Sequence, residues 1–343
     1  MKQIVIEGEI LNLREDYEKF ENNRLSKYGC KSINSIGREM EEEECKIRTK
    51  FQRDRDRIIH SKAFRRLKHK TQVFLAPEGD HYRTRLTHTL EVSQISRTIA
   101  RALKLNEDLT EAISLGHDLG HTPFGHNGEK TLKDITSFGF EHNIQSLRVV
   151  DLLEKHKERQ GLNLTFEVRD GILNHRGDGI PITLEGRIVK TADRIAYLNH
   201  DIDDAVRAGV IKNNDIPKDV IDILGKSHGE RINNMVVDMI EKSLGKEDIA
   251  MSTNAKNAMD NLRRFMFERI YLNTEAKSEN YKAEKILRDL FYYYMDNPNE
   301  IPKDTFSIDE DREVRVKDYI AGMTDRYAIK KYKDIFMPLP WDK

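Results

Sequence analysis

Apolar residues recur at helical spacing along much of the chain, and this pattern predicts several long helices. One run extends from Leu90 to Leu103, with apolar side chains three or four positions apart and basic residues on the opposite side. Asn106 follows, and it is a typical N-cap for a second helix that runs towards His117. The pattern therefore predicts two consecutive helices in this segment.

Two further runs have the same period. Apolar residues from Ile188 to Val206 predict a long helix around Asp193, and those from Ala283 to Phe291 predict another helix, which Pro298 ends. Strand signals are few, because the run 180–184 is too short to anchor a sheet. We therefore expect an all-α protein. Loops are expected around Arg176–Gly179, Lys212–Pro217 and Asn297–Lys303.

Three regions are expected along the chain. Residues 1–50 form an N-terminal arm, residues 51–210 form a core that carries the chemistry, and residues 211–343 form a helical region packed on that core. No repeat with a period of 20–50 residues is visible, and no low-complexity linker divides the sequence. We therefore expect these regions to belong to a single large domain.

Composition excludes several classes of protein. Of the 343 residues, 38% are hydrophobic and 34% are charged, and no run approaches the ~20 apolar residues that a membrane span requires. The first residues show no apolar segment of the secretory type, and two cysteines, Cys30 and Cys45, cannot form a disulfide framework. These features favour a cytoplasmic protein in a reducing compartment. The 58 basic and 59 acidic side chains argue against nucleic-acid binding driven by bulk charge.

The charge is nevertheless unevenly distributed. Residues 53–70 contain eight Lys or Arg and two Asp, a local net charge of +6. The acidic block Glu41–Glu44 lies just upstream, and we expect it to be solvated or to lie in a flexible arm. Eight of the twelve histidines fall between His60 and His142. The neutral total therefore conceals a positive segment and a concentration of imidazoles.

The segment Gly116–Glu129 has the densest potential chemistry. It contains three His, one Asp, one Glu and four Gly in fourteen positions. Imidazole and carboxylate groups are ligands for Mn, Fe, Ni or Zn, and glycine lets the backbone approach a ligand closely. The alternative is a turn-rich loop whose histidines are satisfied by ordinary hydrogen bonds.

Metal binding by this segment needs ligands from elsewhere. His117 and Asp118 point about 100° apart on an ideal helix, so they can share an ion only near a helix end or with other ligands. His88, at the start of one predicted helix, and Asp193, on another, are suitable. Three or four ligands of N and O type leave positions open for water and substrate, as a catalytic metal requires.

The order His88, His117-Asp118, Asp193 resembles the H…HD…D pattern of HD-domain metal phosphohydrolases. Within these, the chain resembles the bacterial deoxyguanosine triphosphate triphosphohydrolase-like proteins. The resemblance covers most of the chain from about residue 20 onwards. The matching stretches are 53–88, including Lys70-Thr71-Gln72-Val73-Phe74, then 116–129, Phe140-Glu141-His142-Asn143, 162–171, 193–201 and 319–327.

The resemblance implies an all-α HD-domain phosphohydrolase fold with a helical C-terminal extension. It also implies metal-dependent hydrolysis of deoxynucleoside triphosphates, dGTP and other dNTPs included, at the α-phosphorus. The products are the deoxynucleoside and inorganic tripolyphosphate. One divalent ion, of Mn, Mg, Fe, Ni or Zn, would be held by His88, His117, Asp118 and Asp193. Mixed His and Asp ligation disfavours Ca but does not distinguish among these metals.

His126 and Glu129 are candidates for proton transfer. Three positions apart, they share one face of a helix, and a carboxylate can orient an imidazole and raise its basicity. The resemblance assigns catalysis to this same pair. The alternative is that Glu129 caps a helix or pairs with Lys130 or Lys133.

Substrate contacts are expected from residues that flank the ligands. Arg85, Lys190 and Arg194 suit a triphosphate, and the 53–70 run offers more cations. By resemblance, His121 reaches the phosphates, His142 supports the site and Gln72 contacts the sugar. Asp193, Tyr197 and Asp201 form one helical stripe of about 12 Å, where Tyr197 would exclude a 2′-hydroxyl and Asp201 would accept a bond from the 3′-hydroxyl.

Two other classes of function stay open at this point. One is another HD phosphohydrolase, a nucleotidase or a phosphodiesterase; the other is a non-catalytic nucleotide sensor or nucleic-acid-binding protein. The stripe with Tyr197 and Asp201 disfavours the first, and the intact ligand set disfavours the second. The resemblance further implies a homo-oligomer, a nucleotide effector and single-stranded DNA as partners, and no membrane association.

Overall fold

The computed structural model describes residues 12–338 except 73–81, 157–158, 272–273 and 303–309, together with two short strands near the N-terminus. Val73 and Phe74 of the matching stretch, and Lys303 at the end of one expected loop, lie outside these residues. Within them, no helix is both long and apolar enough to cross a bilayer.

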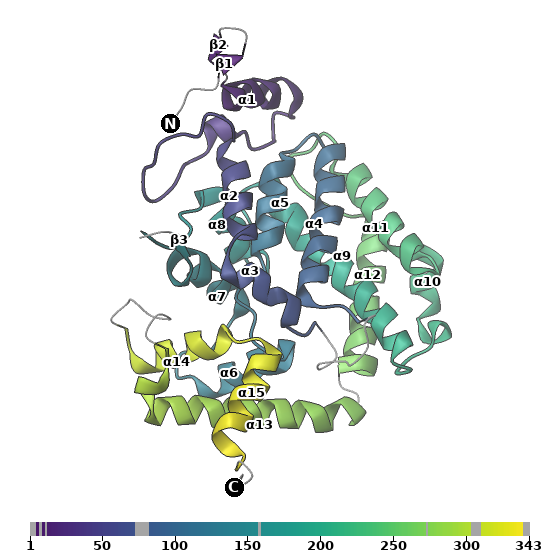
Figure 1. The fold of residues 1–343 in the computed structure, drawn as a ribbon. Coiled ribbons are helices and arrows are strands. Elements are labelled where there is room, and N and C mark those ends of the chain that lie inside the picture. The colour runs from purple at the N-terminus through teal and green to yellow at the C-terminus, as the bar shows by residue number, and fades with distance from the viewer. Residues whose placement is uncertain are drawn as a thin grey trace.

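The described chain is helical, which confirms the all-α prediction (Figure 1). It contains fifteen α-helices, and its strands form only two antiparallel hairpins of two-residue strands. One hairpin pairs Val5 with Ile10, and the other pairs Lys155 with Gln160. The hairpin strands are β1 (Val5–Ile6), β2 (Glu9–Ile10), β3 (Lys155–His156) and β4 (Arg159–Gln160).

A central group of helices carries or adjoins the four predicted metal ligands. Helix α4 packs against α5 and α9, α5 also packs against α2 and α8, and α7 packs against α8. The N-terminal helix α1 (Leu13–Arg24) precedes the group. Its members are α2 (Lys50–Ile59), α3 (Lys62–Arg66), α4 (Arg85–Ala102), α5 (Glu107–Gly116), α7 (His142–Arg148), α8 (Phe166–Asn174) and α9 (Leu184–Arg207).

The later helices lie on two sides of this group (Figure 1). Helices α11 and α12 pack beside α9, whereas α13 packs against α6, α14 and α15. The later helices are α10 (Lys218–Leu224), α11 (His228–Ser243), α12 (Thr253–Met266), α13 (Thr274–Asp296), α14 (Arg312–Ala321) and α15 (Asp325–Phe336). Helix α6, which lies earlier in the chain, spans Gly125–Ile135. Shorter helical turns are η1 (Ser32–Asn34), η2 (Leu67–His69), η3 (Val149–Leu153), η4 (Asn213–Asp215), η5 (Phe267–Tyr271) and η6 (Pro298–Glu300).

Helix starts follow local side-chain chemistry. The Asn106 side chain accepts a hydrogen bond from the N–H of Leu109, so the predicted N-cap of α5 is confirmed. Thr183 caps α9 in the same way by accepting from Gly186. The expected loops around 212–217 and 297–303 are not wholly irregular, because η4 and η6 occupy part of them.

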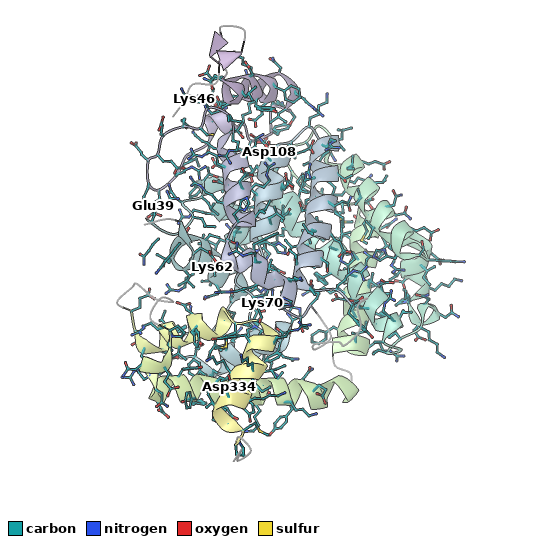
Figure 2. All side chains as sticks on the ribbon, viewed as in Figure 1. Glu39, Lys46, Lys62, Lys70, Asp108 and Asp334 are labelled. Carbon is teal, nitrogen blue, oxygen red and sulfur yellow. The ribbon has the colours of Figure 1, made fainter. Side chains whose placement is uncertain are left out.

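Two hydrophobic clusters form the core. The larger cluster runs from Phe51 to Ile270 and includes the apolar faces of α4, α5 and α9. The smaller one joins Phe124, Leu132 and Phe140 to α13, α14 and α15. Helix α6 therefore packs with the C-terminal helices although its sequence lies within the central segment. The buried Lys70 lies where the two groups of helices meet (Figure 2).

The acidic block Glu41–Glu44 is not solvated throughout, in contrast to the expectation from the sequence. Glu42 is neither free nor fully solvated, because its carboxylate contacts Arg57 at 2.6 Å and Arg38 at 2.9 Å. The other three glutamates of the block are exposed. Although burial opposes ionisation, Arg57, Arg38 and Arg53 together lower the pKa of Glu42. This carboxylate ties the N-terminal arm to α2.

Candidate active site

The four predicted metal ligands converge from three places in the fold. Helix α4 supplies His88, the turn after α5 supplies His117 and Asp118, and α9 supplies Asp193. The Asp193 Oδ1 atom lies 3.0 Å from His88 Nε2 and 3.8 Å from His117 Nε2. His117 Nε2 is 3.4 Å from Asp118 Oδ1. Because α5 ends at Gly116, the two adjacent ligands leave the helix and can face one point.

The donor set fits a divalent metal ion. His117 Nδ1 lies 2.6 Å from the carbonyl oxygen of Ser114, which places the ring proton on Nδ1 and the lone pair on Nε2. That Nε2 is buried and has no hydrogen-bond partner in the described structure. Ligand atoms of His88, His117 and Asp118 all lie within 4.8 Å of one another. A mixed set of imidazole and carboxylate groups is typical of Mn, Fe, Zn or Ni.

Both carboxylates of this centre are held ionised. Burial favours the neutral acid, but His117, His121 and Arg85 hold the pKa of Asp118 well below its usual value. Likewise, contacts with His88 and His117 outweigh burial and lower the pKa of Asp193 to about 2. Charged carboxylates are the forms that bind a cation.

Arg85 reaches the same centre from the first turn of α4. Its side chain is 2% exposed, and its Nη1 donates to Asp118 Oδ2 at 2.7 Å. Nε and Nη2 of this guanidinium have no hydrogen-bond partner in the described part of the chain. Buried donors without partners are costly, so they suit an anionic group that enters the site.

A second cluster contains His121, His142 and Glu129. The rings of His121 and His142 stack with centroids 3.8 Å apart, and His121 Nε2 is 3.2 Å from Asp118 Oδ1. His142 Nδ1 lies 3.1 Å from Glu129 Oε1. The predicted partner His126 is farther from Glu129, at 3.9 Å, and its side chain is 64% exposed. Glu129 is thus closer to His142 than to His126.

The charge state of this cluster is well defined. Burial opposes ionisation of Glu129, yet its interactions with His126 and His142 hold its pKa well below the usual range. Burial lowers the pKa of His142, although Glu129 opposes that effect. Burial also lowers the pKa of His121, and Arg85 adds to it. The cluster therefore pairs an ionised carboxylate with imidazoles that favour the neutral form.

Two residues of this cluster were missed in the sequence. His175, which follows α8, places its Nε2 3.2 Å from His142 Nε2, and its Nδ1 is 2.7 Å from the carbonyl oxygen of Ile172. Arg176 Nη1 contacts Glu129 and lies 2.9 Å from His142 Nδ1. The signal in the sequence is a His-Arg pair directly after an apolar helix, where the sequence analysis expects only a loop around Arg176–Gly179.

The remaining candidates differ in their surroundings. The Lys190 ammonium group donates to the carbonyl oxygens of Gly177 and Gly179, so it holds the loop that carries Arg176. Arg194 lies 3.8 Å from Asp260. Gln72 and Asp201 are buried, and burial raises the pKa of Tyr197 on α9 to about 12. Their substrate contacts stay predictions.

Comparison with known proteins finds two regions that match family models. Residues 85–198 match the HD domain, and residues 249–334 match the phosphohydrolase-associated domain. The chain is 59% identical over 333 residues to a deoxyguanosinetriphosphate triphosphohydrolase-like protein of Caldanaerobacter subterraneus subsp. tengcongensis, covering 96% of this chain and 98% of the relative. A protein of the same description from Desulfatibacillum aliphaticivorans is 49% identical over 352 residues, covering 96% and 99%.

A solved structure shares the fold. The crystal structure of a phosphohydrolase from Bacteroides thetaiotaomicron superposes with a TM-score of 0.51 at 19% identity. The alignment covers 82% of this chain and 68% of that one. At this identity the likeness concerns the helical arrangement alone.

Proposed function

Because this chain belongs to the deoxyguanosinetriphosphate triphosphohydrolase-like family of HD phosphohydrolases, we propose that it hydrolyses deoxynucleoside triphosphates at the α-phosphorus. The products would be a deoxynucleoside and inorganic tripolyphosphate. The observation that carries the proposal is the convergence of His88, His117, Asp118 and Asp193 beside the unpartnered donors of Arg85. Metal ligands and an anion-binding guanidinium are together what phosphoryl chemistry requires.

The ligand set assigns a role to the metal. A divalent ion bound by these four residues would supply Lewis-acid polarisation of the α-phosphate. Arg85 would neutralise charge on the phosphates through its free Nε and Nη2 groups. His121, 2% exposed and 3.2 Å from Asp118, would donate a hydrogen bond to a phosphate oxygen from its ring.

Proton handling would depend on Glu129. Because this carboxylate is ionised, it orients a neighbouring imidazole rather than donating a proton itself. His126 is our proposed proton-transfer residue, since its ring is accessible and shares the α6 face with Glu129. His142 is the more tightly held imidazole, and its buried position suits support of Glu129.

Sugar recognition would come from α9. Asp193, Tyr197 and Asp201 lie at successive turns of this helix, so the stripe leads about 12 Å away from the metal ligands. A deoxyribose would lie along Tyr197, whose ring would exclude a 2′-hydroxyl. Asp201 and Gln72 would provide polar contacts at the sugar.

Product analysis tests the proposal directly. The four dNTPs, singly and mixed, are incubated with Mg²⁺ or Mn²⁺, and tripolyphosphate is quantified. We expect tripolyphosphate from at least one dNTP or mixture, and activity only with mixtures would indicate an effector. Asp193→Asn should abolish it, because one ligand loses its charge, whereas Asp248→Asn on the surface should not.

Other products would favour the other functions. Fully metallated protein that releases no tripolyphosphate from any dNTP or mixture would contradict the proposal. Orthophosphate from nucleoside monophosphates would indicate another HD phosphohydrolase. A cellular or binding role that survives Asp118→Ala would instead indicate a non-catalytic sensor.

A further inference from the structure

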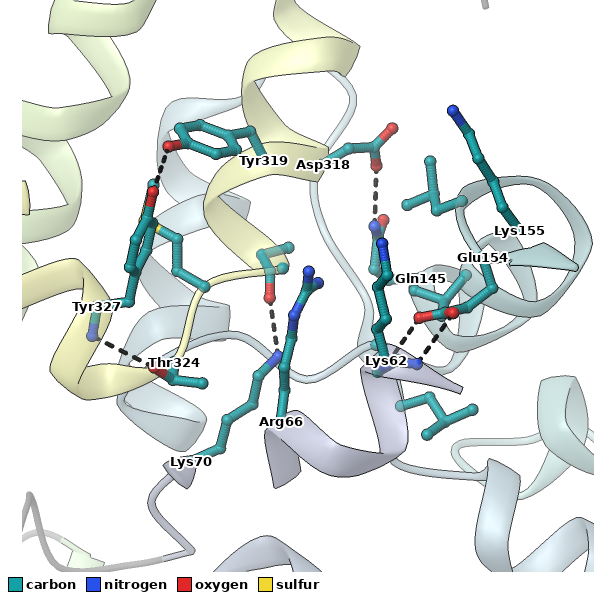
Figure 3. A pocket seen from close by; sticks show the side chains of 18 of the residues that line it. Lys62, Arg66, Lys70, Gln145, Glu154, Lys155, Asp318, Tyr319, Thr324 and Tyr327 are labelled. Carbon is teal, nitrogen blue, oxygen red and sulfur yellow. Dashed lines mark hydrogen bonds between the residues drawn. The ribbon is translucent and has the colours of Figure 1, made fainter. Parts of the chain in front are cut away.

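A cavity of about 430 Å³ lies between the central helices and the C-terminal helices (Figure 3). Its walls come from α3, from α7 and η3, and from the end of α14, the start of α15 and the turn between them. Leu119 and Gly120, directly after the metal ligand Asp118, also line it. None of the four metal ligands does, so the cavity is separate from the candidate active site. Its size is typical of a small-molecule site.

The acidic groups of this cavity are already engaged. Glu154 accepts hydrogen bonds from the backbone N–H groups of Lys62 and Ala63. Asp318 accepts from Gln145 at 2.8 Å and from Arg148 at 2.8 Å, and Lys317 lies 2.6 Å from it. These carboxylates are therefore satisfied by the protein itself.

The basic groups are not equally engaged. The side chains of Lys62 and Arg66 make no hydrogen bond or ion pair with any residue that the structure describes. Lys70, 2% exposed, donates to the carbonyl oxygens of His121 and Ala321, which leaves one of its three N–H groups without a partner among the described residues. The cavity thus has an uncompensated positive side.

Arg66 and Lys70 both point towards the turn between α14 and α15 (Figure 3). Arg66 Nη1 would lie 3.4 Å from a Cβ atom at Gly322, so the missing side chain leaves room for the guanidinium. The rest of the wall is less polar: it includes Val149, Met323 and the rings of Tyr319 and Tyr327, whose hydroxyls are 3.0 Å apart. One side suits an anion and the other suits an organic body.

We propose that this cavity binds a small organic phosphate, with the phosphate at Lys62, Arg66 and Lys70 and the organic part against Met323 and the tyrosines. Guanidinium and ammonium groups are the usual phosphate partners in proteins. An occupant would contact Leu119 and Gly120, on the loop that carries His117 and Asp118.

Calorimetric titration of the full chain in excess chelator tests the site, since removing metal separates it from the metal-dependent reaction. The probes are deoxyguanosine monophosphate, deoxyguanosine and orthophosphate. We expect the monophosphate to bind and the nucleoside to bind at least tenfold more weakly. The double variant Lys62→Ala, Arg66→Ala should weaken binding of the monophosphate at least tenfold.

The control variant Arg65→Ala, Lys68→Ala removes the same charge from the same segment, but neither residue lines the cavity. It should bind the monophosphate as the unmodified protein does. Equal binding by both double variants, or equal loss in both, would overturn the site. Orthophosphate binding as tight as the monophosphate would overturn the assignment of an organic ligand. None of these results bears on whether dNTPs are hydrolysed.

Discussion

At the scale of single residues, Arg176 connects two groups that are distant in the sequence. Its guanidinium contacts the Glu129 carboxylate and lies 2.9 Å from His142 Nδ1. The backbone around it is held in turn by Lys190, whose ammonium group bonds to Gly177 and Gly179. Arg176 is therefore a positioning residue for the proposed proton-transfer cluster.

Arg176→Gln should lower kcat about ten- to a hundredfold and change KM little, because Glu129 loses a partner that fixes its orientation. Steady-state kinetics with the preferred dNTP measure both parameters. Arg176→Lys should restore part of kcat. Arg101→Gln, which breaks an exposed ion pair with Glu107, is the control. An unchanged kcat in Arg176→Gln would show that Glu129 is held without it.

Glu185 is a buried residue that does not belong to the cluster of Glu129, His142 and Arg176. Its Oε1 accepts from the N–H groups of Cys30 and Asn106, both at 2.9 Å, while Oε2 has no hydrogen-bond partner in the described structure. Burial raises its pKa from 4.5 to about 7, although the backbone N–H groups oppose this. The folded protein therefore binds more protons here than the unfolded chain between these two pH values.

This sign means that the Glu185 contribution to stability falls as pH rises from about 4.5 to 7. Glu185→Gln should remove the loss, which is on the order of 3 kcal/mol at about 1.4 kcal/mol per pKa unit. The free energy of unfolding of the variant, minus that of the unmodified protein, should therefore be more positive at pH 8 than at pH 4. Urea unfolding at both pH values measures it, with the exposed Glu247→Gln as control. Parallel pH profiles would contradict the prediction.

The sequence allowed prediction of some site residues better than others. His88, His117, Asp118 and Asp193 share an ordered pattern, and their donor atoms lie close together in the structure, as do those of His121 and His142. That the first four bind a metal stays a prediction. His175 has no such pattern, because its contact with His142 arises only when α7 packs against α8. Pairwise contacts set by helix packing are not encoded in local spacing.

At the scale of elements, the start of α6 is unusually confined. Phe124 precedes the helix with a φ of 64°, a left-handed conformation that is uncommon for a bulky residue. A Cβ atom on Gly128 would lie 1.9 Å from the carbonyl oxygen of Pro123 and 2.5 Å from Thr122 Oγ1. The first turn of α6 thus folds back onto the segment that leads into it.

Gly128→Ala should destabilise the protein by about 2 kcal/mol or more, because backbone must move to admit the methyl group. It should also lower activity, since α6 carries His126 and Glu129. Thermal unfolding and product assays measure the two effects. Gly229→Ala in α11 is the matched control: its Cβ meets no atom within 4 Å, and it should be neutral or slightly stabilising. Equal behaviour of the two variants would contradict this account.

The basic run 53–70 divides into residues that form ion pairs within the fold and residues that face the cavity. In α2, Arg55 bonds to Asp108 and Arg57 bonds to Glu42, so this half of the run serves the fold. In α3, Lys62 and Arg66 face the cavity instead. The sequence predicted the positive segment, but the division depends on which acidic residues other elements bring to it.

At the scale of the whole molecule, Asp325 joins the C-terminal helices to the active-site side. Its Oδ2 accepts from the N–H and hydroxyl of Thr71, and its Oδ1 accepts from the N–H of Phe124 at 3.0 Å. Thr71 precedes Gln72, and Phe124 precedes α6. A single buried carboxylate thereby holds two segments that carry candidate substrate and catalytic residues.

Asp325→Asn should destabilise the protein by about 2 kcal/mol. Both carboxylate oxygens of Asp325 accept hydrogen bonds, and in the variant the NH₂ group of the amide would face one of those donors. Activity should fall as the two segments loosen. Asp334→Asn, an exposed substitution on α15, is the control (Figure 2). Thermal unfolding and dNTP hydrolysis of both variants are compared. An Asp325→Asn protein as stable and active as the control would show that the junction does not depend on this carboxylate.

The fold class expected from the sequence is confirmed, whereas the three expected regions stay a prediction. Helical periods identify α4, α5 and α9, but they do not show that α6 packs with α13. The expected division at residue 210 follows the chain, whereas the two hydrophobic clusters follow contacts between distant segments. Long-range packing of this kind is not visible in the spacing of apolar positions.

The smaller hydrophobic cluster limits which fragments and chimeras of this protein can fold. A fragment ending after α12 would keep the whole HD-domain match and all four predicted metal ligands. It would nevertheless expose Phe124, Leu132 and Phe140, three residues whose apolar neighbours lie on α13 to α15. Such a fragment would aggregate through that surface. In chimeras between relatives, α6 and the phosphohydrolase-associated region must therefore come from the same parent.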